Sequence, residues 1–262
     1  MSLFTMTGKT ALVTGGSRGI GQAMAVGLAE AGADIVLVQR DQTQTATKDA
    51  IEALGRRCAI TVADLSDRES VKGVISSVTA SQRVDILVNV AGIMRRHDAQ
   101  DYPDHDLDEV MEVNFNCTFL LCRDIGKYWI ENKIPGRMIN TASLATFQGG
   151  VRMAAYSASK GAVGQLTKAL SNEWAAHGIR VNAIAPGSSP DQTYYNSITT
   201  RIPMGKWGSP DEFKGPVVFL ASDASSYITG QIIVVSSREV YLDLSASPRL
   251  TAKQVDGGWM AR

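Results

Sequence analysis

A glycine-rich loop near the N-terminus is the feature that most constrains the fold. The octet TGGSRGIG, residues 14–21, directly follows a short apolar segment, Thr10–Thr14, and directly precedes a helical pattern over Ile20–Ala31. Ala23 and Leu28 belong to the apolar face of that helix. A glycine pattern alone is a weak signal, but a strand, a glycine turn and a helix in immediate succession predict the first unit of a dinucleotide-binding α/β fold.

Strand-like apolar segments alternate with helical periodicity along most of the chain. This alternation is typical of a parallel sheet with helices on both faces. The predicted strands are Thr10–Thr14, Ile35–Val38, Ala59–Ala63, Ile86–Asn89, Arg137–Thr141, Arg180–Ile184 and Ile232–Val235. The chain has 262 residues, of which 44% are hydrophobic and 20% charged, which is enough to bury one large core. We therefore predict a single Rossmann-type, doubly wound domain over residues 1–262, built on a seven-stranded parallel sheet.

Charge and cysteine content narrow the possible partners. Lys plus Arg equals Asp plus Glu at 26 each, and no basic block stands out. We therefore expect a small-molecule substrate, with neither nucleic acid nor a membrane as partner. The chain has no cleavable apolar segment at its start and no run of about eighteen apolar residues, which predicts a cytoplasmic protein. Cys58, Cys117 and Cys122 are scattered and lack metal-ligand spacing, so we expect reduced thiols and no metal site.

The glycines of the loop suit the binding of a nucleotide cofactor. Gly15 can turn the chain tightly, Gly19 can let the backbone approach a pyrophosphate, and Gly21 can let the helix pack closely. The N–H groups at the start of the helix can bind the anion. The alternative is a glycine-rich turn without a ligand. The loop residues predicted to bind the cofactor are Gly15, Ser17, Arg18, Gly19, Ile20 and Gly21.

The end of the second predicted strand bears on the choice between NAD and NADP. An acid at this point hydrogen-bonds the ribose 2′-hydroxyl of NAD. Here the strand ends in Gln39-Arg40-Asp41. Uncharged Gln39 would not repel a 2′-phosphate, and Arg40 together with Arg18 could pair with it, which favours NADP(H) over NAD(H). Two alternatives stay open: the arginines are ordinary surface charges, or Asp41 acts as the acid.

The loop spacing and a series of further motifs resemble the classical type of the short-chain dehydrogenase/reductase family. The motifs are ADLSD with Asp64, NVAG over residues 89–92, VNFN with Asn114, NTAS with Ser143, YSASK over residues 156–160, and Pro186-Gly187. The resemblance extends along nearly the whole chain. It implies an NAD(P)-dependent oxidoreductase that acts on CH–OH groups.

The same resemblance implies which residues form the site. It assigns catalysis to Asn114, Ser143, Tyr156 and Lys160, with the backbone of Asn114 helping to hold a water that relays protons to Lys160. In NVAG, Val90 replaces the second asparagine of the family pattern. Outside the glycine loop, the predicted cofactor-binding residues are Arg40, Asp64, Leu65, Asn89, Ala91, Gly92, Tyr156, Lys160, Pro186 and Gly187.

The chemistry of Tyr156 and Lys160 also follows from the residues themselves. Four positions apart on a helix, the two side chains lie on one face and can converge on one site. A phenol is a poor base at neutral pH, and lowering its pKa by about three units requires about 4 kcal/mol of differential stabilisation of the phenolate. The positive charge of the Lys160 ammonium can supply part of that stabilisation. Tyr156 would then exchange a proton with the substrate oxygen, while Ser143 orients that oxygen.

The segment IPMGKWG, residues 202–208, points to a substrate class within the family. It resembles the branch of gluconate 5-dehydrogenases and 2-deoxygluconate or 2-keto-3-deoxygluconate dehydrogenases, so we expect a sugar acid or polyol as substrate. Arg95 and Arg96 follow the fourth predicted strand, where they could bind a carboxylate, although a solvated basic loop is the simpler explanation for either one alone. The 3-oxoacyl carrier-protein reductases carry a related segment and are the alternative function.

Two segments depart from the family pattern and keep a non-catalytic, cofactor-binding member of the family as a further alternative. After Gly187 the chain reads SSPDQT, residues 188–193, where the family pattern has a threonine that contacts the nicotinamide, followed by a longer lid. Residues 235–254 separate the last predicted strand from the ending VDGGWMAR. Deleting them joins GQIIV directly to VDGGWMAR, so the segment is predicted to be a clean insertion.

Two explanations of residues 235–254 compete. The segment could be a surface loop, because lengthening a loop costs only about 0.6 kcal/mol per doubling of its length. It could also be a translated intron, because Val235-Ser236 can be encoded by GTGAGT and Gln254 by CAG. The resemblance implies a homo-oligomer, tetramer or dimer, with contacts near the last strand. An insertion there would threaten assembly more directly than chemistry.

Overall fold

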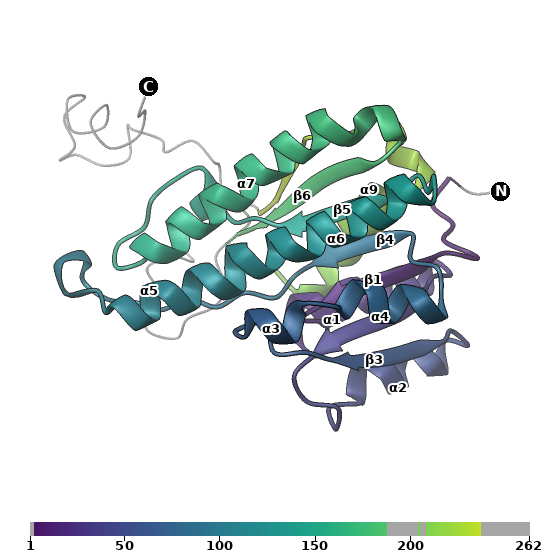
Figure 1. Ribbon diagram of the computed structural model, residues 1–262, viewed down its shortest axis with the longest axis horizontal. Helices are drawn as coiled ribbons and strands as arrows, with labels where there is room; N and C mark the ends of the chain where they lie inside the picture. The colour runs from purple at the N-terminus through teal and green to yellow at the C-terminus, as the bar shows by residue number, and fades with distance from the viewer. Residues whose placement is uncertain (1–2, 188–203, 205–207, 237–262) are drawn as a thin grey trace.

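A computed structural model describes residues 3–187, 204 and 208–236. Its centre is a parallel sheet of seven strands in the order β3-β2-β1-β4-β5-β6-β7 (Figure 1). The strands are β1 Thr10–Thr14, β2 Asp34–Gln39, β3 Cys58–Val62, β4 Ile86–Asn89, β5 Arg137–Thr141, β6 Arg180–Pro186 and β7 Ile232–Val235. The predicted fold class is confirmed. The structure shifts the third predicted strand by one residue and extends the second and sixth, since ladder pairing sets strand ends.

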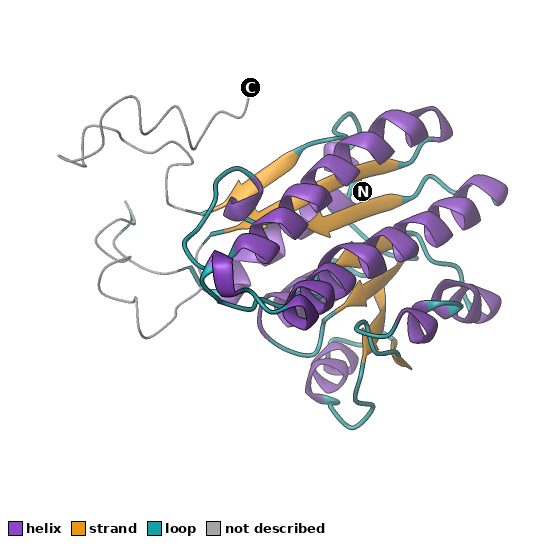
Figure 2. Ribbon diagram, turned by 60° about the vertical axis from the view of Figure 1, so that its left-hand side comes forward, coloured by secondary structure: helices purple, strands orange, loops and turns teal. Residues whose placement is uncertain are grey.

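Helices cover both faces of the sheet, as Figure 2 shows for one side. Helices α4, α6 and α7 contribute to the apolar core on one face, and α1, α2 and α9 to the core on the other. The helices are α1 Gly19–Glu30, α2 Ala46–Ala53, α3 Arg68–Val71, α4 Val74–Ser81, α5 Asp104–Met111, α6 Cys117–Glu131, α7 Ala154–Trp174 and α9 Lys214–Ala221. A π-helical turn, η2 Glu112–Asn116, joins α5 to α6.

The two cores follow from the alternation of side chains along each strand. In β1, Leu12 belongs to the core beneath α4, α6 and α7, whereas Ala11 and Val13 belong to the core beneath α1, α2 and α9. All five residues of β1 are buried, as expected for a central strand covered on both faces.

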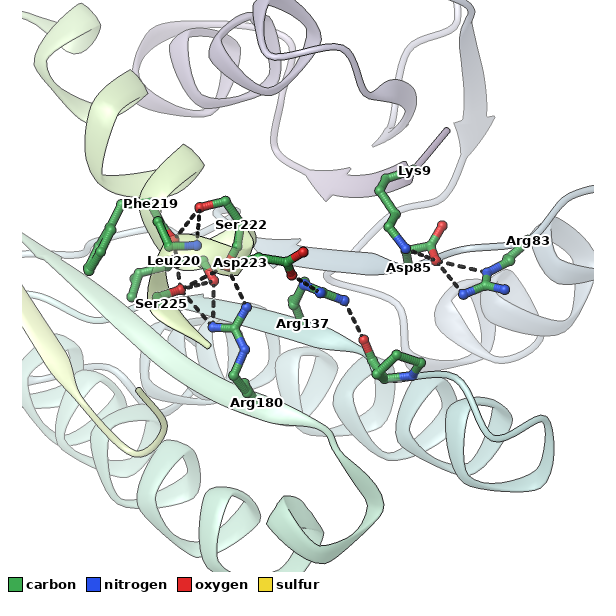
Figure 3. Close-up of polar contacts among 12 residues, drawn as sticks. Lys9, Arg83, Asp85, Arg137, Arg180, Phe219, Leu220, Ser222, Asp223 and Ser225 are labelled. Carbon is green, nitrogen blue, oxygen red and sulfur yellow. Dashed lines mark hydrogen bonds and ion pairs between the residues drawn. The ribbon is translucent and has the colours of Figure 1, made fainter. Parts of the chain in front are cut away.

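Ion pairs and helix caps hold the amino-terminal edge of the sheet (Figure 3). The Asp85 carboxylate is buried and accepts hydrogen bonds from the Thr10 backbone N–H at 3.2 Å and from Arg83 at 2.8 Å. The Arg180 guanidinium donates to the Leu220 and Ser222 carbonyls at 3.0 and 2.9 Å, which caps the end of α9. Burial lowers the pKa of Arg180 to about 10. These charges therefore stabilise the amino-terminal edge of the sheet. Open α/β sheets bind ligands at the opposite edge, outside the carboxyl ends of the strands.

The strand order reverses at β1, which pairs with both β2 and β4. In open α/β sheets, ligands bind in the crevice outside the carboxyl ends of the strands at such a reversal. The glycine loop follows β1, and residues 90–92 follow β4, so both lie at the carboxyl edge of the sheet beside this reversal. Within the described residues, no helix is long and apolar enough to span a bilayer. The same residues include no group of three or more His, Cys, Asp or Glu side chains arranged to bind a metal.

Candidate active site

Lys160 lies at the centre of the predicted site. Its side chain is buried, and its ammonium donates a 2.7 Å hydrogen bond to the carbonyl of Thr141, the last residue of β5. A Cβ on Gly92 would stand 3.4 Å from the Lys160 nitrogen and 3.3 Å from Oδ1 of Asn114. The ends of β4 and β5, the π turn and α7 therefore meet at one point.

Tyr156 lies one helical turn before Lys160, and its ring centroid is 5.8 Å from the Lys160 nitrogen. Burial raises the pKa of the Tyr156 phenol, while a hydrogen bond with the Ser143 side chain acts in the opposite direction. Burial also lowers the pKa of Lys160 to about 8. The structure thus brings Ser143, Tyr156 and Lys160 together in a partly desolvated setting, where electrostatic interactions are strengthened.

Asn114 is held in the π turn, and its side-chain amide is fully engaged. Oδ1 accepts from the Ile93 N–H at 2.8 Å, while Nδ2 donates to the Ile93 carbonyl at 2.9 Å and to Oγ of Ser159 at 3.0 Å. The Ser159 hydroxyl in turn donates to the Tyr156 carbonyl at 2.8 Å. Asn114 therefore ties the segment after β4 to the helix of Tyr156. The π turn was not predicted, although such turns are frequent at functional sites.

The glycine loop has the backbone geometry that its sequence predicted. Gly15 and Gly19 have φ values of +68° and +58°, in the left-handed region that favours glycine. A Cβ on Gly15 would lie 2.8 Å from the Ala91 backbone, and a Cβ on Gly21 would overlap the Gly15 carbonyl oxygen. The Arg18 side chain makes no capping bond at the start of α1, which leaves first-turn N–H groups able to bind an anion.

Thr14 connects this loop to the segment after β4, and sequence analysis did not single it out. Its hydroxyl accepts from the backbone N–H groups of Val90 and Ala91 at 3.1 and 3.4 Å. The signal was its position as the last residue of β1, opposite Asn89 in the ladder. A hydroxyl at that position can satisfy amides that leave the sheet.

The polar residues at the end of β2 differ in their hydrogen bonding and exposure. Gln39 is buried, and its Nε2 donates to the Asp41 and Gln44 carbonyls at 2.7 and 2.9 Å. The Asp41 carboxylate accepts from the backbone N–H and hydroxyl of Thr43, which lowers its pKa. Arg40 is exposed, like Arg18. Gln39 and Asp41 therefore shape the turn, while both arginines are exposed and the charge of Arg40 contributes to lowering the pKa of Asp64.

The remaining residues predicted to bind the cofactor lie at or just after the carboxyl ends of β3 and β6. The Asp64 carboxylate accepts from the Ser66 N–H and hydroxyl, which lowers its pKa against the opposing effect of burial. The Leu65 carbonyl accepts a hydrogen bond from Cys117 at 2.9 Å. Pro186 ends β6 opposite Val235. The N–H of Gly187 donates to the Val235 carbonyl at 3.2 Å.

Asn89 points its side chain into the core. Its Nδ2 donates to Oδ1 of Asn140 at 3.0 Å and approaches Sγ of Cys122 at 3.3 Å. Asn140 continues the network to the Thr167 hydroxyl at 3.1 Å. The Asn89 side chain thus links β4 and β5 to α6 and α7.

Arg95 and Arg96 differ in their surroundings. Arg95 pairs with Glu109 at 2.8 Å and with Asp106 at 3.4 Å, both on α5. His97 also contacts Asp106, at 2.5 Å. Arg96 is exposed. The positive charge of Arg95 is therefore balanced by helix α5.

The segments 188–200 and 237–254, in which the sequence departs from the family pattern, lie outside the described residues. Of the predicted insertion over residues 235–254, only Val235 and Ser236 are described. Val235 is the last residue of β7.

Comparison with known proteins gives consistent similarities. A family model described as short chain dehydrogenase matches residues 9–194. The 2-dehydro-3-deoxy-D-gluconate 5-dehydrogenase of Pseudoalteromonas atlantica is 45% identical, over 99% of this chain and 98% of the relative. A putative NAD(P)-dependent gluconate 5-dehydrogenase from Beutenbergia cavernae, solved with bound NADP at low occupancy, has a TM-score of 0.87 at 41% identity, over 90% of this chain and 98% of its own. A gluconate 5-dehydrogenase from Burkholderia cenocepacia, in complex with NADP and tartrate, has a TM-score of 0.84 at 35% identity, over 89% of this chain and 96% of its own.

Proposed function

The chain belongs to the short chain dehydrogenase family, and we propose that it transfers a hydride between NADP(H) and a secondary hydroxyl of a sugar acid. It is an NAD(P)-dependent oxidoreductase acting on CH–OH groups. The observation that carries the proposal is the convergence of Ser143, Tyr156 and Lys160 beside the glycine loop, at the carboxyl edge of the sheet. A non-catalytic, cofactor-binding protein could use Lys160 to bind ribose, but it would give no role to the Ser143 hydroxyl and the Tyr156 phenol beside it.

The residues around the crevice fit a dinucleotide. The positive φ of Gly15 and Gly19, the contact of Gly15 with the Ala91 backbone and the uncapped first turn of α1 together leave room and N–H donors for a pyrophosphate. When bound, the nicotinamide ring accepts or donates the hydride. Residues near Asp64 and Leu65 would border the adenine, and those near Pro186 and Gly187 the nicotinamide.

Tyr156 acts as the acid and base in this mechanism. In oxidation its phenolate takes the proton of the substrate hydroxyl, and in reduction its phenol returns that proton to the carbonyl oxygen. The Ser143 hydroxyl binds the same substrate oxygen and orients it. Since burial raises the pKa of Tyr156, the phenolate needs nearby positive charge, which the Lys160 ammonium supplies. Lys160 would also bind ribose hydroxyls, and Asn114 would support a water between Lys160 and solvent.

The charges at the end of β2 support NADP(H) over NAD(H). A 2′-phosphate needs cations, and Arg18 and Arg40 are both exposed near this end of the crevice. The alternative is Asp41: both hydrogen bonds from Thr43 go to its Oδ1, so its other oxygen could still accept from a free 2′-hydroxyl of NAD(H). Two of the similar solved structures hold NADP.

The substrate that we propose first is 2-dehydro-3-deoxy-D-gluconate, with gluconate second. The support is the name of the relative that matches 99% of this chain, and the tartrate, a hydroxy acid, in the structure of a second relative. Arg95 and Arg96 both remain candidates for the substrate carboxylate, and Arg95 would have to exchange its pairing with α5 for that contact. A 3-oxoacyl carrier-protein reductase is not favoured, since these relatives are named for sugar acids.

The setting in which the chain works is also part of the proposal. We expect a single catalytic domain over residues 1–262 that assembles into a homo-oligomer in the cytoplasm. Three free, buried cysteines, Cys58, Cys117 and Cys122, support a reducing compartment. Sedimentation of the purified chain measures the assembly.

The deciding experiment is an assay of the purified chain with each cofactor in turn. The substrates are 2-dehydro-3-deoxy-D-gluconate, gluconate, a polyol and a 3-oxoacyl thioester, and cofactor absorbance reports turnover. Turnover with the sugar acids supports the proposal, whereas turnover with the thioester alone supports the reductase. Cofactor binding without turnover on any of these substrates would favour a non-catalytic member of the family.

A further inference from the structure

The hydroxyl of Thr146 bridges two parts of the site. Thr146 ends the short 3-10 helix η3, Leu144–Thr146, which Ser143 caps. The Thr146 Oγ1 accepts from the Ser143 backbone N–H at 3.2 Å and donates to the Lys160 carbonyl at 2.9 Å. A hydroxyl has one donor and two acceptor positions, so both bonds form at once.

The methyl group of Thr146 fits against α7 at a glycine. A Cβ added to Gly164, one turn after Lys160, would lie 2.5 Å from Cγ2 of Thr146, too close for two carbon atoms. The absence of a side chain on Gly164 is therefore what lets Thr146 approach the helix closely enough to reach the Lys160 carbonyl. Hydroxyl and methyl together fix Thr146 on α7.

The two bridged segments carry groups that must act on one substrate oxygen. Ser143 precedes η3, whereas Tyr156 and Lys160 lie on α7. The Ser143 hydroxyl also accepts from the Ala145 N–H at 3.1 Å, so its direction depends on the geometry of η3. A small displacement of η3 relative to α7 would change the position of Ser143 relative to Tyr156.

We propose that Thr146 is a positioning residue, which holds Ser143 in register with Tyr156 and Lys160 through its bridge from the Ser143 N–H to the Lys160 carbonyl. This inference rests on the proposed hydride transfer. Thr146 itself needs no contact with substrate or cofactor, so its contribution is to kcat and not to cofactor affinity.

The variants Thr146→Val and Thr146→Ser test the hydroxyl separately from the methyl. T146V keeps the shape of the side chain but loses both hydrogen bonds, and we expect kcat to fall by roughly ten- to hundredfold, as misplacement of reacting groups does. The Kd for cofactor should stay within about twofold. T146S keeps the hydroxyl and should restore most of kcat.

The pH dependence of kcat distinguishes a loss of positioning from a general loss of stability. Since the Ser143 hydrogen bond lowers the pKa of Tyr156, loosening it should move the acidic limb of kcat for oxidation to higher pH in T146V and not in T146S. Hydrogen exchange of the Ser143 amide should accelerate in T146V alone. Exchange and cofactor affinity need no turnover, so they test the bridge even if the proposed function fails in the substrate assay.

A double variant tests the contact with Gly164. G164A should lower kcat, because the added Cβ displaces the Thr146 methyl, and T146S/G164A should recover part of the loss, because that methyl is gone. Thr79 offers a matched control: it is half-buried on α4, and its hydroxyl donates to the Ile75 carbonyl at 2.8 Å, away from the site. T79V should keep kcat.

Some outcomes would overturn the inference. If T146V kept the wild-type kcat and pH profile, Thr146 would be structural only. The same would hold if its loss of activity were fully explained by a smaller folded fraction at the assay temperature. Equal losses in T146V and T146S would remove the hydroxyl bridge from the explanation. If the losses of kcat in T146S and G164A simply added in T146S/G164A, the contact between the Thr146 methyl and Gly164 would be removed from the explanation.

Discussion

The ammonium of Lys160 donates a 2.7 Å hydrogen bond to the carbonyl of Thr141 and lies in a buried position at the end of β5. A carbonyl is a weaker partner than a carboxylate, so it compensates only part of the cost of burying the charge. That cost is expressed as a pKa lowered to about 8 from 10.5.

The first prediction concerns stability against pH. Because the folded-state pKa of Lys160 is depressed, the buried charge destabilises the fold below pH 8, and this cost declines as pH rises from 8 towards 10.5. Relative to Lys160→Met, the wild-type free energy of unfolding should increase by roughly 2 kcal/mol between pH 7 and 9.5. Urea unfolding of both proteins at the two pH values measures the difference. If the free energies of unfolding of the two proteins changed equally between these pH values, the buried charge would be ruled out as the source.

The second prediction concerns the acid and base. Tyr156→Phe removes the phenol oxygen but keeps the ring, so turnover should fall by at least about a hundredfold in either direction. Cofactor affinity, measured by fluorescence titration, should change little because Lys160 and the loop are intact. Substantial turnover in Y156F would exclude Tyr156 as the proton donor and acceptor.

The third prediction concerns the glycine loop. Gly21→Ala places a Cβ on the Gly15 carbonyl and should abolish cofactor binding, with a loss of stability of about 1–3 kcal/mol from overpacking. Gly215 is the control, because a Cβ there meets nothing within 4 Å. G215A should bind cofactor normally and unfold within about 1 kcal/mol of wild type. Calorimetry of cofactor binding distinguishes the two, and normal binding by G21A would contradict the close-packing role.

The fourth prediction concerns the choice of cofactor. Replacing Arg18 and Arg40 by Ala should raise the Kd for NADP about tenfold for each arginine that pairs with the 2′-phosphate, since one charge-assisted contact is worth about 1.5–3 kcal/mol at most. The Kd for NAD should change by less than about threefold. An unchanged Kd for NADP would mean that the arginines are ordinary surface charges, and equal rises for both cofactors would mean that they contact a part that NAD and NADP share.

The fifth prediction concerns residues 235–254. We expect the transcript to lack their codons, so that Val255 follows Val234 and takes the place of Val235 opposite Pro186. The pairing of β7 with β6 would then keep the same side chain at that position. Sequencing of cDNA decides the matter: a transcript that encodes the whole segment makes it a true insertion.

Local sequence patterns predicted the bounds of most strands. The bounds of β1, β4, β5 and β7 agree with the predicted strands; β1, β4 and β7 are short, mainly apolar runs, whereas β5, RMINT, mixes apolar and polar residues. The ends of β2 and β6 were predicted short, since Gln39 and Pro186 are not typical strand residues and pair only because neighbouring strands extend beside them. The π turn at Asn114 had no counterpart in the predicted helices, because a single widened turn does not change hydrophobic periodicity.

The sequence by itself determined the α/β fold, the glycine loop and the pairing of Tyr156 with Lys160, because each depends on residues near one another in the chain. Only the tertiary structure decided that Arg95 is balanced by α5 and that the Asn89 side chain enters the core. It also decided that Thr146 joins Ser143 to Lys160. These contacts join segments that meet only when helices pack on the sheet, and a hydroxyl or amide shows its partner only after packing has brought that partner within about 3 Å.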